Sequence, residues 1–158
     1  MSERVPMTRE GYEALKAELS RLKTVDRLEN VRDIEEAIAH GDLSENAEYH
    51  AAKEKQSHIA GRIALLDDKL ARAQVIELSG HDGDKVRFGA TVVLTDVETD
   101  EEVTYRIVGE DEEDPKQGLI SVTSPVARAL INKGVDDEVV VKAPKGDRGF
   151  EILEVRFE

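Results

Sequence analysis

Two carboxylates, Asp42 and Glu45, lie three residues apart in a short segment that interrupts two long helical patterns. At the start of a helix this spacing would place both on one face, within reach of one hard cation such as Mg²⁺. The ion prefers six oxygen ligands, so water and a partner would have to complete the site. The alternative is structural, because acids in a first helical turn stabilise the helix dipole by about 0.3–1 kcal/mol each. The spacing alone leaves both interpretations open.

Basic residues follow the acids along the chain, at Lys53, Lys55 and Arg62. A solvated helix face explains such charges adequately. A local positive patch that guides a phosphate backbone is the alternative, and Lys53 is the best placed of the three. The four histidines lack the spacing of a metal site, and we expect them to be surface residues.

Two long amphipathic helices must position these side chains. The first runs from the N-cap candidate Thr8 to about Ala39, and its roughly 30 residues would span about 45 Å. Its apolar residues recur at steps of three and four in a row that Val25 and Leu28 shift in phase: Tyr12, Leu15, Leu19 and Leu22 before the shift, and Val31, Ile34 and Ile38 after it. The second helix repeats in the same way: Ala52, Gln56, Ile59, Ile63, Leu66, Leu70 and Ala73. The two seams predict an antiparallel coiled-coil hairpin that folds at Gly41, with Ser44 or Asp42 available to cap the outgoing helix.

The composition changes near Leu78, after which valine, isoleucine and glycine become frequent. Ser124 and Pro125 predict an N-cap and a first helical residue of a short helix that runs through Ile131. Strands are expected at 91–95, 103–107, 118–122, 139–141 and 150–157. The fold class is therefore α+β, with a helical hairpin in residues 1–77 and a small antiparallel sheet with one short helix in residues 78–158.

Charge and composition limit the classes of function. The 158 residues carry a formal net charge of −13, with 12 basic and 16 acidic side chains in residues 1–77 and 10 and 19 in the rest. This argues against an autonomous nucleic-acid binder, which needs Lys and Arg to neutralise phosphates. Cysteine is absent, which excludes disulfides, thiolate metal sites and a cysteine nucleophile. Without an apolar signal region or a membrane-length run, we expect a cytoplasmic monomer with no membrane contact.

The segment Gly41-Asp42-Leu43-Ser44-Glu45-Asn46-Ala47-Glu48-Tyr49-His50-Ala51-Ala52-Lys53-Glu54 resembles the signature of the bacterial Gre transcript cleavage factors, in the GreA branch. Further segments fall in the family's order, so the resemblance covers essentially the whole chain: 6–8, 61–63, 73–76, 88–92, 105–109 and 120–128. The GreB branch carries a more basic hairpin than this acidic chain.

The resemblance implies an elongation factor that acts on bacterial RNA polymerase and is not a nuclease alone. An FKBP-like carboxy-terminal domain would dock at the rim of the secondary channel, and the coiled coil would enter that channel. The polymerase would then cleave backtracked nascent RNA near its 3′ end. Asp42 and Glu45 match the family's two essential tip acids, which would hold Mg²⁺ jointly with the polymerase. Two ligands suffice if the enzyme supplies the rest.

Other residues take their expected roles from the same resemblance or from their place in the chain. Lys53 matches a position in the family's basic patch facing RNA. That patch is halved here because Ile38 stands where an arginine is frequent, and Leu28 replaces a usual proline. The polymerase contact is expected in the opening of the short helix, at Ser124, Pro125, Val126 and Arg128, where apolar and basic side chains lie close together. These four residues could also simply cap and pack that helix.

Three rival functions remain. A Gre-fold protein that binds polymerase without promoting cleavage would be expected to lack the tip acids, yet both are present. An FKBP-like chaperone or prolyl isomerase is disfavoured because aromatic residues make up only 4% of the chain. A plain coiled-coil adaptor would not need Asp42 and Glu45.

Overall fold

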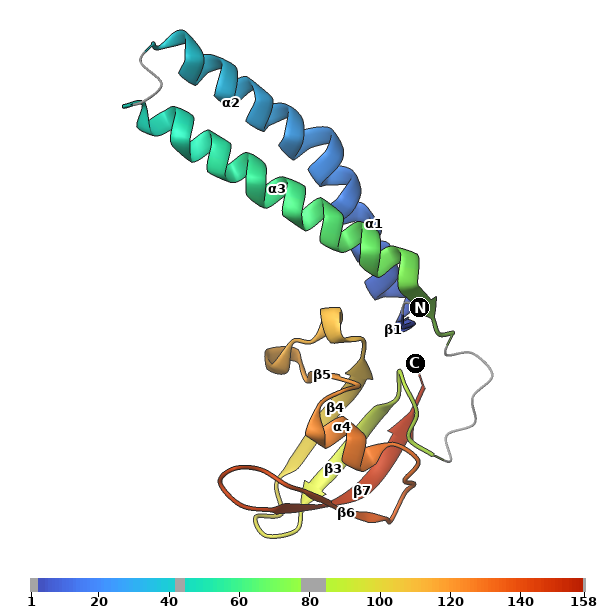
Figure 1. Ribbon diagram of the computed structural model, residues 1–158. Coiled ribbons are helices and arrows are strands. Elements are labelled where there is room, and N and C mark those ends of the chain that lie inside the picture. Colours follow the sequence, from blue (N-terminus) through green and yellow to red (C-terminus); the bar gives the residue numbers. More distant parts are fainter. Residues whose placement is uncertain (1–2, 42–44, 78–84, 158) are drawn as a thin grey trace. The chain divides into compact units, whose positions relative to one another are not determined.

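The structure is a computed structural model that describes residues 3–41, 45–77 and 85–157 (Figure 1). Its contacts form two compact units. One comprises Met1–Glu3 and Tyr12–Ala73, and the other comprises Arg4–Gly11 and Gln74–Glu158. The α+β class, the helical hairpin and the small sheet are confirmed. The expected domain boundary between residues 77 and 78 stays a prediction.

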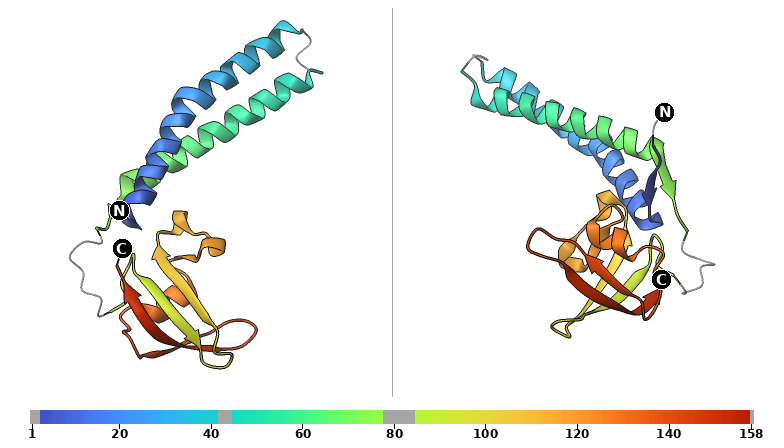
Figure 2. Two further views of the ribbon diagram at one scale, coloured as in Figure 1. Left: turned by 180° about the vertical axis from the view of Figure 1, so that it is seen from behind. Right: turned by 60° about the horizontal axis from the view of Figure 1, so that its bottom comes forward.

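The first long helix is continuous but not uniform. It consists of α1 (Arg9–Arg21), a π-helical turn (Leu22–Asp26) and α2 (Arg27–Ala39). The returning helix α3 (Ala47–Arg72) runs antiparallel to α2 in all the views (Figures 1 and 2). Its 26 residues give a length of about 39 Å.

The π-helical turn changes which face of α2 is buried. A π turn inserts one extra residue, which rotates the following helix by about 100°. Asn30 and Ala37 of α2 are therefore buried, and the buried residues of α3 are Ala52, Ile59, Ile63 and Leu66. The expected seam is wrong at Val31 and Ile38 of α2, which are at least 40% exposed. Val25 and Leu28, where the sequence pattern shifts phase, are exposed as well. Gln56, expected in the α3 seam, is also exposed.

Asn30 is a buried polar residue between the two helices of the hairpin. The Nδ2 group of Asn30 donates to the main-chain oxygen of Ala52 at 2.9 Å, and Asn30 is 1% exposed. A single buried asparagine between helices fixes their register at some cost in stability. We therefore expect Asn30 to help fix how α2 and α3 align.

Replacing Asn30 should show how much its buried side chain contributes to the stability of the hairpin. Asn30→Leu removes a buried polar group, while the Ala52 oxygen keeps its bond within α3, so we expect the free energy of unfolding to stay level or rise by up to about 1 kcal/mol. Asn30→Ala should lower it by about 1–3 kcal/mol, because it leaves a cavity as well. Urea unfolding followed by helical circular dichroism measures both. A loss of more than about 1 kcal/mol in Asn30→Leu would contradict the expectation.

The sheet has five strands in the order β5-β4-β3-β7-β6. They are β3 (Thr91–Asp96), β4 (Glu102–Val108), β5 (Leu119–Ser121), β6 (Glu138–Val141) and β7 (Arg148–Arg156), and α4 (Pro125–Leu130) contacts β5 and β6. The core lies where α4 meets the sheet, and its fully buried members include Val92, Leu94, Ile107, Leu130 and Ile152. The register pairs Val92 with Tyr105 and Leu94 with Ile152.

One strand pair differs from the expected antiparallel sheet. β4 and β5 are parallel, with Ile107 opposite Ile120, so the sheet is mixed. Parallel neighbours need a crossover connection rather than a tight turn. Here the connection contains the short 3₁₀ helices Glu110–Glu112 and Pro115–Gln117. This connection returns the chain so that β5 runs in the same direction as β4.

A two-stranded sheet of β1 (Val5–Met7) and β2 (Ala73–Val75) was not expected. A strand of three residues is too short to show the two-residue alternation of apolar and polar side chains. These two strands also lie more than sixty residues apart in the sequence. The Ile76 amide continues the contact by donating to the Met7 oxygen at 2.9 Å.

Thr8 caps α1 as expected, because its Oγ1 accepts from the Gly11 amide at 3.0 Å. The Glu112 carboxylate accepts from the amides of Thr8 at 3.1 Å and Gly109 at 3.0 Å, and from the Thr8 hydroxyl. A Cβ atom at residue 11 would overlap the Glu112 carboxyl group, which explains the glycine there. These bonds lie within the unit that contains the sheet, to which Arg4–Gly11 belong.

Candidate functional site at the end of the helical hairpin

α2 ends at a glycine, as the sequence predicts. His40 and Gly41 donate main-chain bonds to Ala37 at 3.2 Å and Ile38 at 3.1 Å. Gly41 then takes φ +93°, a left-handed conformation that favours glycine and commonly ends helices.

α3 begins later in the chain than expected, at Ala47. Asn46 is its N-cap, and the Asn46 Oδ1 accepts from the Tyr49 amide at 3.0 Å. The expectation that Ser44 or Asp42 caps α3 is therefore wrong, although both residues lie outside the described residues. Asparagine belongs to the preferred N-cap class, so its type was the signal that the sequence analysis missed.

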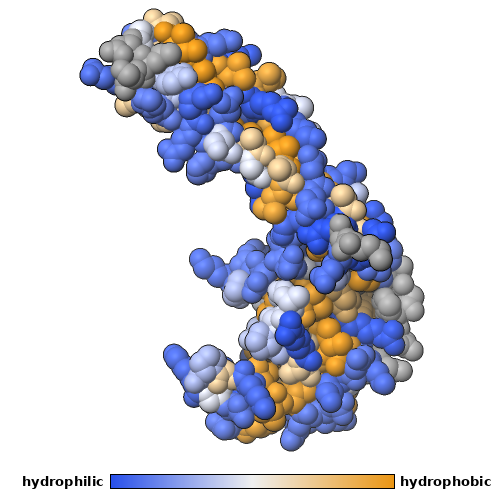
Figure 3. Space-filling view, viewed as in Figure 1, coloured by the Kyte–Doolittle hydropathy of each residue, from blue (hydrophilic) through white to orange (hydrophobic). Residues whose placement is uncertain are grey.

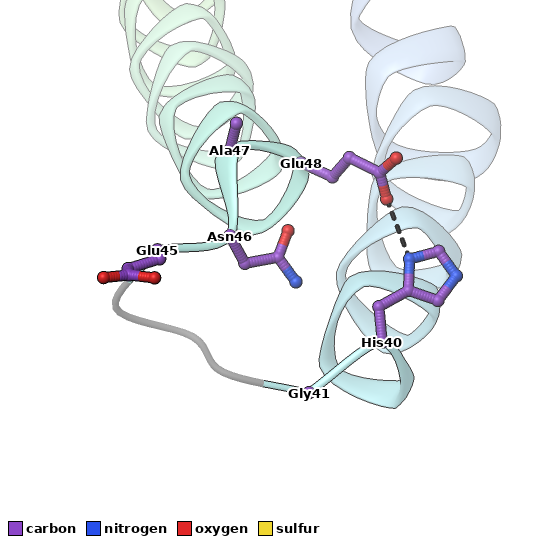
Figure 4. Close-up of a pocket in the computed structure, with 6 residues that line it drawn as sticks. All are labelled: His40, Gly41, Glu45, Asn46, Ala47 and Glu48. Carbon is purple, nitrogen blue, oxygen red and sulfur yellow. Dashed lines mark hydrogen bonds and ion pairs between the residues drawn. The ribbon is translucent and has the colours of Figure 1, made fainter.

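Glu45 precedes the N-cap, so it does not belong to the first turn of α3. The expectation that Asp42 and Glu45 share the face of one helix is therefore wrong for Glu45, which lies before α3, and Asp42 lies outside the described residues. Glu45 is exposed and helps to line an open cavity of about 420 Å³ between the helix ends, and its carboxylate points outward (Figure 4). An acid there gains little from the helix dipole, which weakens the purely structural interpretation.

The oxygen ligands at this end are of the type that binds a hard cation, but the described residues do not form a complete metal site. Glu45 offers carboxylate oxygens, which Mg²⁺ prefers. Near it, the His40 Nδ1 and the Glu48 Oε2 lie 3.0 Å apart (Figure 4). Within residues 3–41, 45–77 and 85–157, no group of three or more His, Cys, Asp or Glu residues could hold a metal. A metal site that Glu45 shares with Asp42 and a partner stays a prediction, and Asp42 lies outside the described residues.

Lys53 is exposed on α3, and its Nζ donates to the Gln56 Oε1 at 2.9 Å. It lines a mainly apolar groove of about 560 Å³ together with Arg27. Arg27 is therefore a second basic residue near Lys53 that the sequence analysis did not single out. Ile38 is half exposed, so its side chain is not held in the helix seam.

Arg62 takes part in an ion pair within the hairpin. Its Nε and Nη2 atoms donate to the two Glu18 carboxylate oxygens at 2.6 and 2.8 Å. This bidentate pair joins the first helix to α3 and makes Arg62 a poor candidate for contacting phosphate. The Arg62 side chain, mainly by these hydrogen bonds, holds the pKa of Glu18 below its ordinary value.

The Glu18–Arg62 pair should give the hairpin a pH-dependent contribution to stability. A lowered folded-state pKa means that the contribution is complete above the ordinary glutamate pKa of about 4.3 and is lost as pH falls through the lower value. Both side chains are partly exposed, so we expect a coupling of about 0.2–1 kcal/mol at pH 7. A double-mutant cycle with Glu18→Gln and Arg62→Gln, measured at pH 7 and pH 3, tests it. Equal coupling at both pH values would contradict the assignment.

The short helix α4 opens as predicted. The Ser124 Oγ accepts from the Ala127 amide at 3.2 Å, and Pro125 is the first helical residue. Val126 packs against the core, whereas Pro125 and Arg128 are exposed. Of the four residues expected to contact polymerase, Ser124 and Val126 thus have structural roles, and Pro125 and Arg128 present the available surface.

No helix in the described part of the chain is long and apolar enough to cross a membrane.

Family models match both parts of the chain. The model described as transcription elongation factor, N-terminal, matches residues 5–75, and the one described as transcription elongation factor, GreA/GreB, C-term, matches residues 81–157. The chain belongs to the GreA/GreB family of transcription elongation factors. The expected GreA branch agrees with its relatives.

Transcription elongation factor GreA of Hyphomonas neptunium is 63% identical over 156 residues, covering 99% of each chain. GreA of Anaeromyxobacter sp. (strain K) is 61% identical over 155 residues, covering 98% of this chain and 93% of the relative. A solved structure of the transcription factor Gfh1 is 28% identical, covers 99% of each chain and has a TM-score of 0.48.

Proposed function

We propose that this member of the family binds bacterial RNA polymerase, places the end of its helical hairpin in the secondary channel and stimulates Mg²⁺-dependent cleavage of backtracked RNA. The observation that carries the proposal is the exposed Glu45 carboxylate in the connection between α2 and α3, with Asp42 three residues before it. A helix pair about 39 Å long separates this connection from the other end of the hairpin. Such a hairpin can carry two acids into a narrow channel.

Asp42 and Glu45 would hold Mg²⁺ together with carboxylates of the polymerase. When bound there, the ion would help to activate water and stabilise charge on the phosphate. The role of the two side chains is to supply oxygen ligands from the side that the enzyme leaves open. Because Glu45 lies outside the helix, its carboxylate is not engaged in capping α3. Catalysis then belongs to the assembled complex.

Lys53 is proposed to face the extruded RNA, with Arg27 beside the same groove. Both are cations on an acidic chain, so their contribution should be local and should weaken with added salt. Arg62 is not included, because Glu18 holds its guanidinium group.

The decisive experiment uses stalled, backtracked polymerase with labelled RNA. Adding the protein with Mg²⁺ should release short 3′ fragments and leave a transcript that the polymerase can extend. Polymerase alone supplies the basal rate, and protein without polymerase is the second control. A factor that displaces a competitor from polymerase but leaves the basal rate unchanged would be a regulator without cleavage activity.

Pro125 and Arg128 of α4 are proposed as part of the polymerase contact. Arg128→Glu should raise the Kd for polymerase about tenfold, since interface arginines often contribute more than 1 kcal/mol. Lys145→Glu makes the same charge change at an exposed position in the connection between β6 and β7 and should leave the Kd close to that of the unaltered protein. Equal affinities of a folded Arg128→Glu variant and the unaltered protein would remove Arg128 from the interface.

A further inference from the structure

Asn46 makes hydrogen bonds to both helices of the hairpin. Its Oδ1 accepts from the Tyr49 amide in the first turn of α3 at 3.0 Å. Its Nδ2 donates to the Ala37 main-chain oxygen in the last turn of α2 at 2.7 Å. The side chain extends from the start of α3 toward the end of α2 (Figure 4). One amide group therefore joins the two helix ends.

The two bonds require different chemistry. Capping α3 needs only an acceptor, which serine or aspartate supplies about as well as asparagine. The bond to Ala37 needs an N–H donor at the end of a side chain of this length. Aspartate has the length but no donor when ionised, and the serine hydroxyl ends one bond from Cβ. The requirement for a cap alone would therefore not select asparagine.

The bond lies between the two ends of the connection that carries the tip acids. The Ala37 oxygen also accepts from the His40 amide at 3.2 Å, and the next carbonyl, of Ile38, accepts from Gly41 at 3.1 Å. The Asn46 bond thus joins the last turn of α2, just before Gly41, to the residue that follows Glu45. Gly41 and Glu45 are both exposed, so little packing fixes them otherwise.

We infer that Asn46 is a positioning residue for the tip carboxylates. Its N–H bond to Ala37 fixes the end of α2 against the start of α3, and so fixes the span across which Asp42 and Glu45 are presented to the polymerase. The inference rests on the proposed function. A displacement of about 1 Å at a reacting centre can cost about 100-fold in rate, so loss of this bond should affect cleavage more than binding.

Two variants of the full chain test the N–H bond. Asn46→Ser and Asn46→Asp both keep an acceptor for Tyr49, and neither keeps the donor for Ala37. Backbone ¹⁵N relaxation and amide exchange in the unbound protein should show a mobile Gly41 and Glu45 but a protected Tyr49 amide. With backtracked polymerase, the cleavage rate at saturating factor should fall about tenfold, and the concentration for half-maximal effect should stay unchanged.

Glu45→Gln in the same assay separates this inference from the proposed function. If Glu45→Gln cleaves normally, the tip acids need no positioning and both ideas are wrong. If Glu45→Gln is inactive while both Asn46 variants cleave normally, only the positioning role is overturned. A defect in Asn46→Asp but not in Asn46→Ser would assign the loss to added charge. Loss of Tyr49 amide protection in both variants would assign the loss of cleavage to the missing helix cap. Each of these last two outcomes would overturn the role of the bond to Ala37.

Discussion

Asp42→Asn and Glu45→Gln should each lower factor-dependent RNA cleavage at least about tenfold, equivalent to about 1.4 kcal/mol in the activation barrier. Both changes keep the size of the side chain but weaken its binding to a hard cation. Neither acid belongs to the helix seam or to α4, so affinity for polymerase should be unchanged. Cleavage of a labelled transcript in a backtracked complex measures the first effect, and competition for polymerase measures the second.

Glu48→Gln is the matched control for these variants. Glu48 is exposed in the first turn of α3, lines the same cavity as Glu45 and interacts with His40. The change removes the same charge from the same end of the hairpin, so a general effect of charge would lower cleavage equally. We expect Glu48→Gln to retain most of the cleavage. Normal cleavage by the Asp42→Asn, Glu45→Gln double variant would show that the tip acids do not bind the metal.

The protein alone should leave RNA intact in the presence of Mg²⁺ and should bind the ion no tighter than about millimolar. Asp42 and Glu45 offer two of the six ligands that Mg²⁺ prefers, and water competes for an exposed carboxylate. Calorimetric titration of the unbound protein measures the affinity, and incubation with purified RNA measures the activity. The rate of RNA cleavage should differ greatly between the protein alone and the same protein on backtracked polymerase, where cleavage should be rapid.

Asp42→Asn is the informative control in both measurements. Weak ion binding by the many acidic residues of the surface should be the same in this variant and in the unaltered protein. Micromolar affinity, or cleavage without polymerase, that disappears in Asp42→Asn would reveal a self-contained active site. That result would defeat the shared-metal mechanism even if the protein also acts on polymerase.

Much of the local structure follows from the sequence alone, because its signals come from neighbouring residues. The caps at Thr8 and Ser124, the glycine stop at Gly41 and the strands of the sheet were all predicted. A hydroxyl before a helix, a glycine after it and a two-residue period each act within one or two turns of the chain. The tip acids were recognised for the same reason, as a compact run of residues.

Only the tertiary structure decided which side chains the hairpin buries and how distant segments pair. The buried positions of α2 are Asn30 and Ala37 rather than Val31 and Ile38, and no residue type in the sequence indicates the π-helical turn that precedes them. The parallel pairing of β5 and the contact of β1 with β2 depend on partners far along the chain. Asn46 gained its second partner only when α2 and α3 came together. These features arise from non-local contacts, whose free energy exists only in the folded chain.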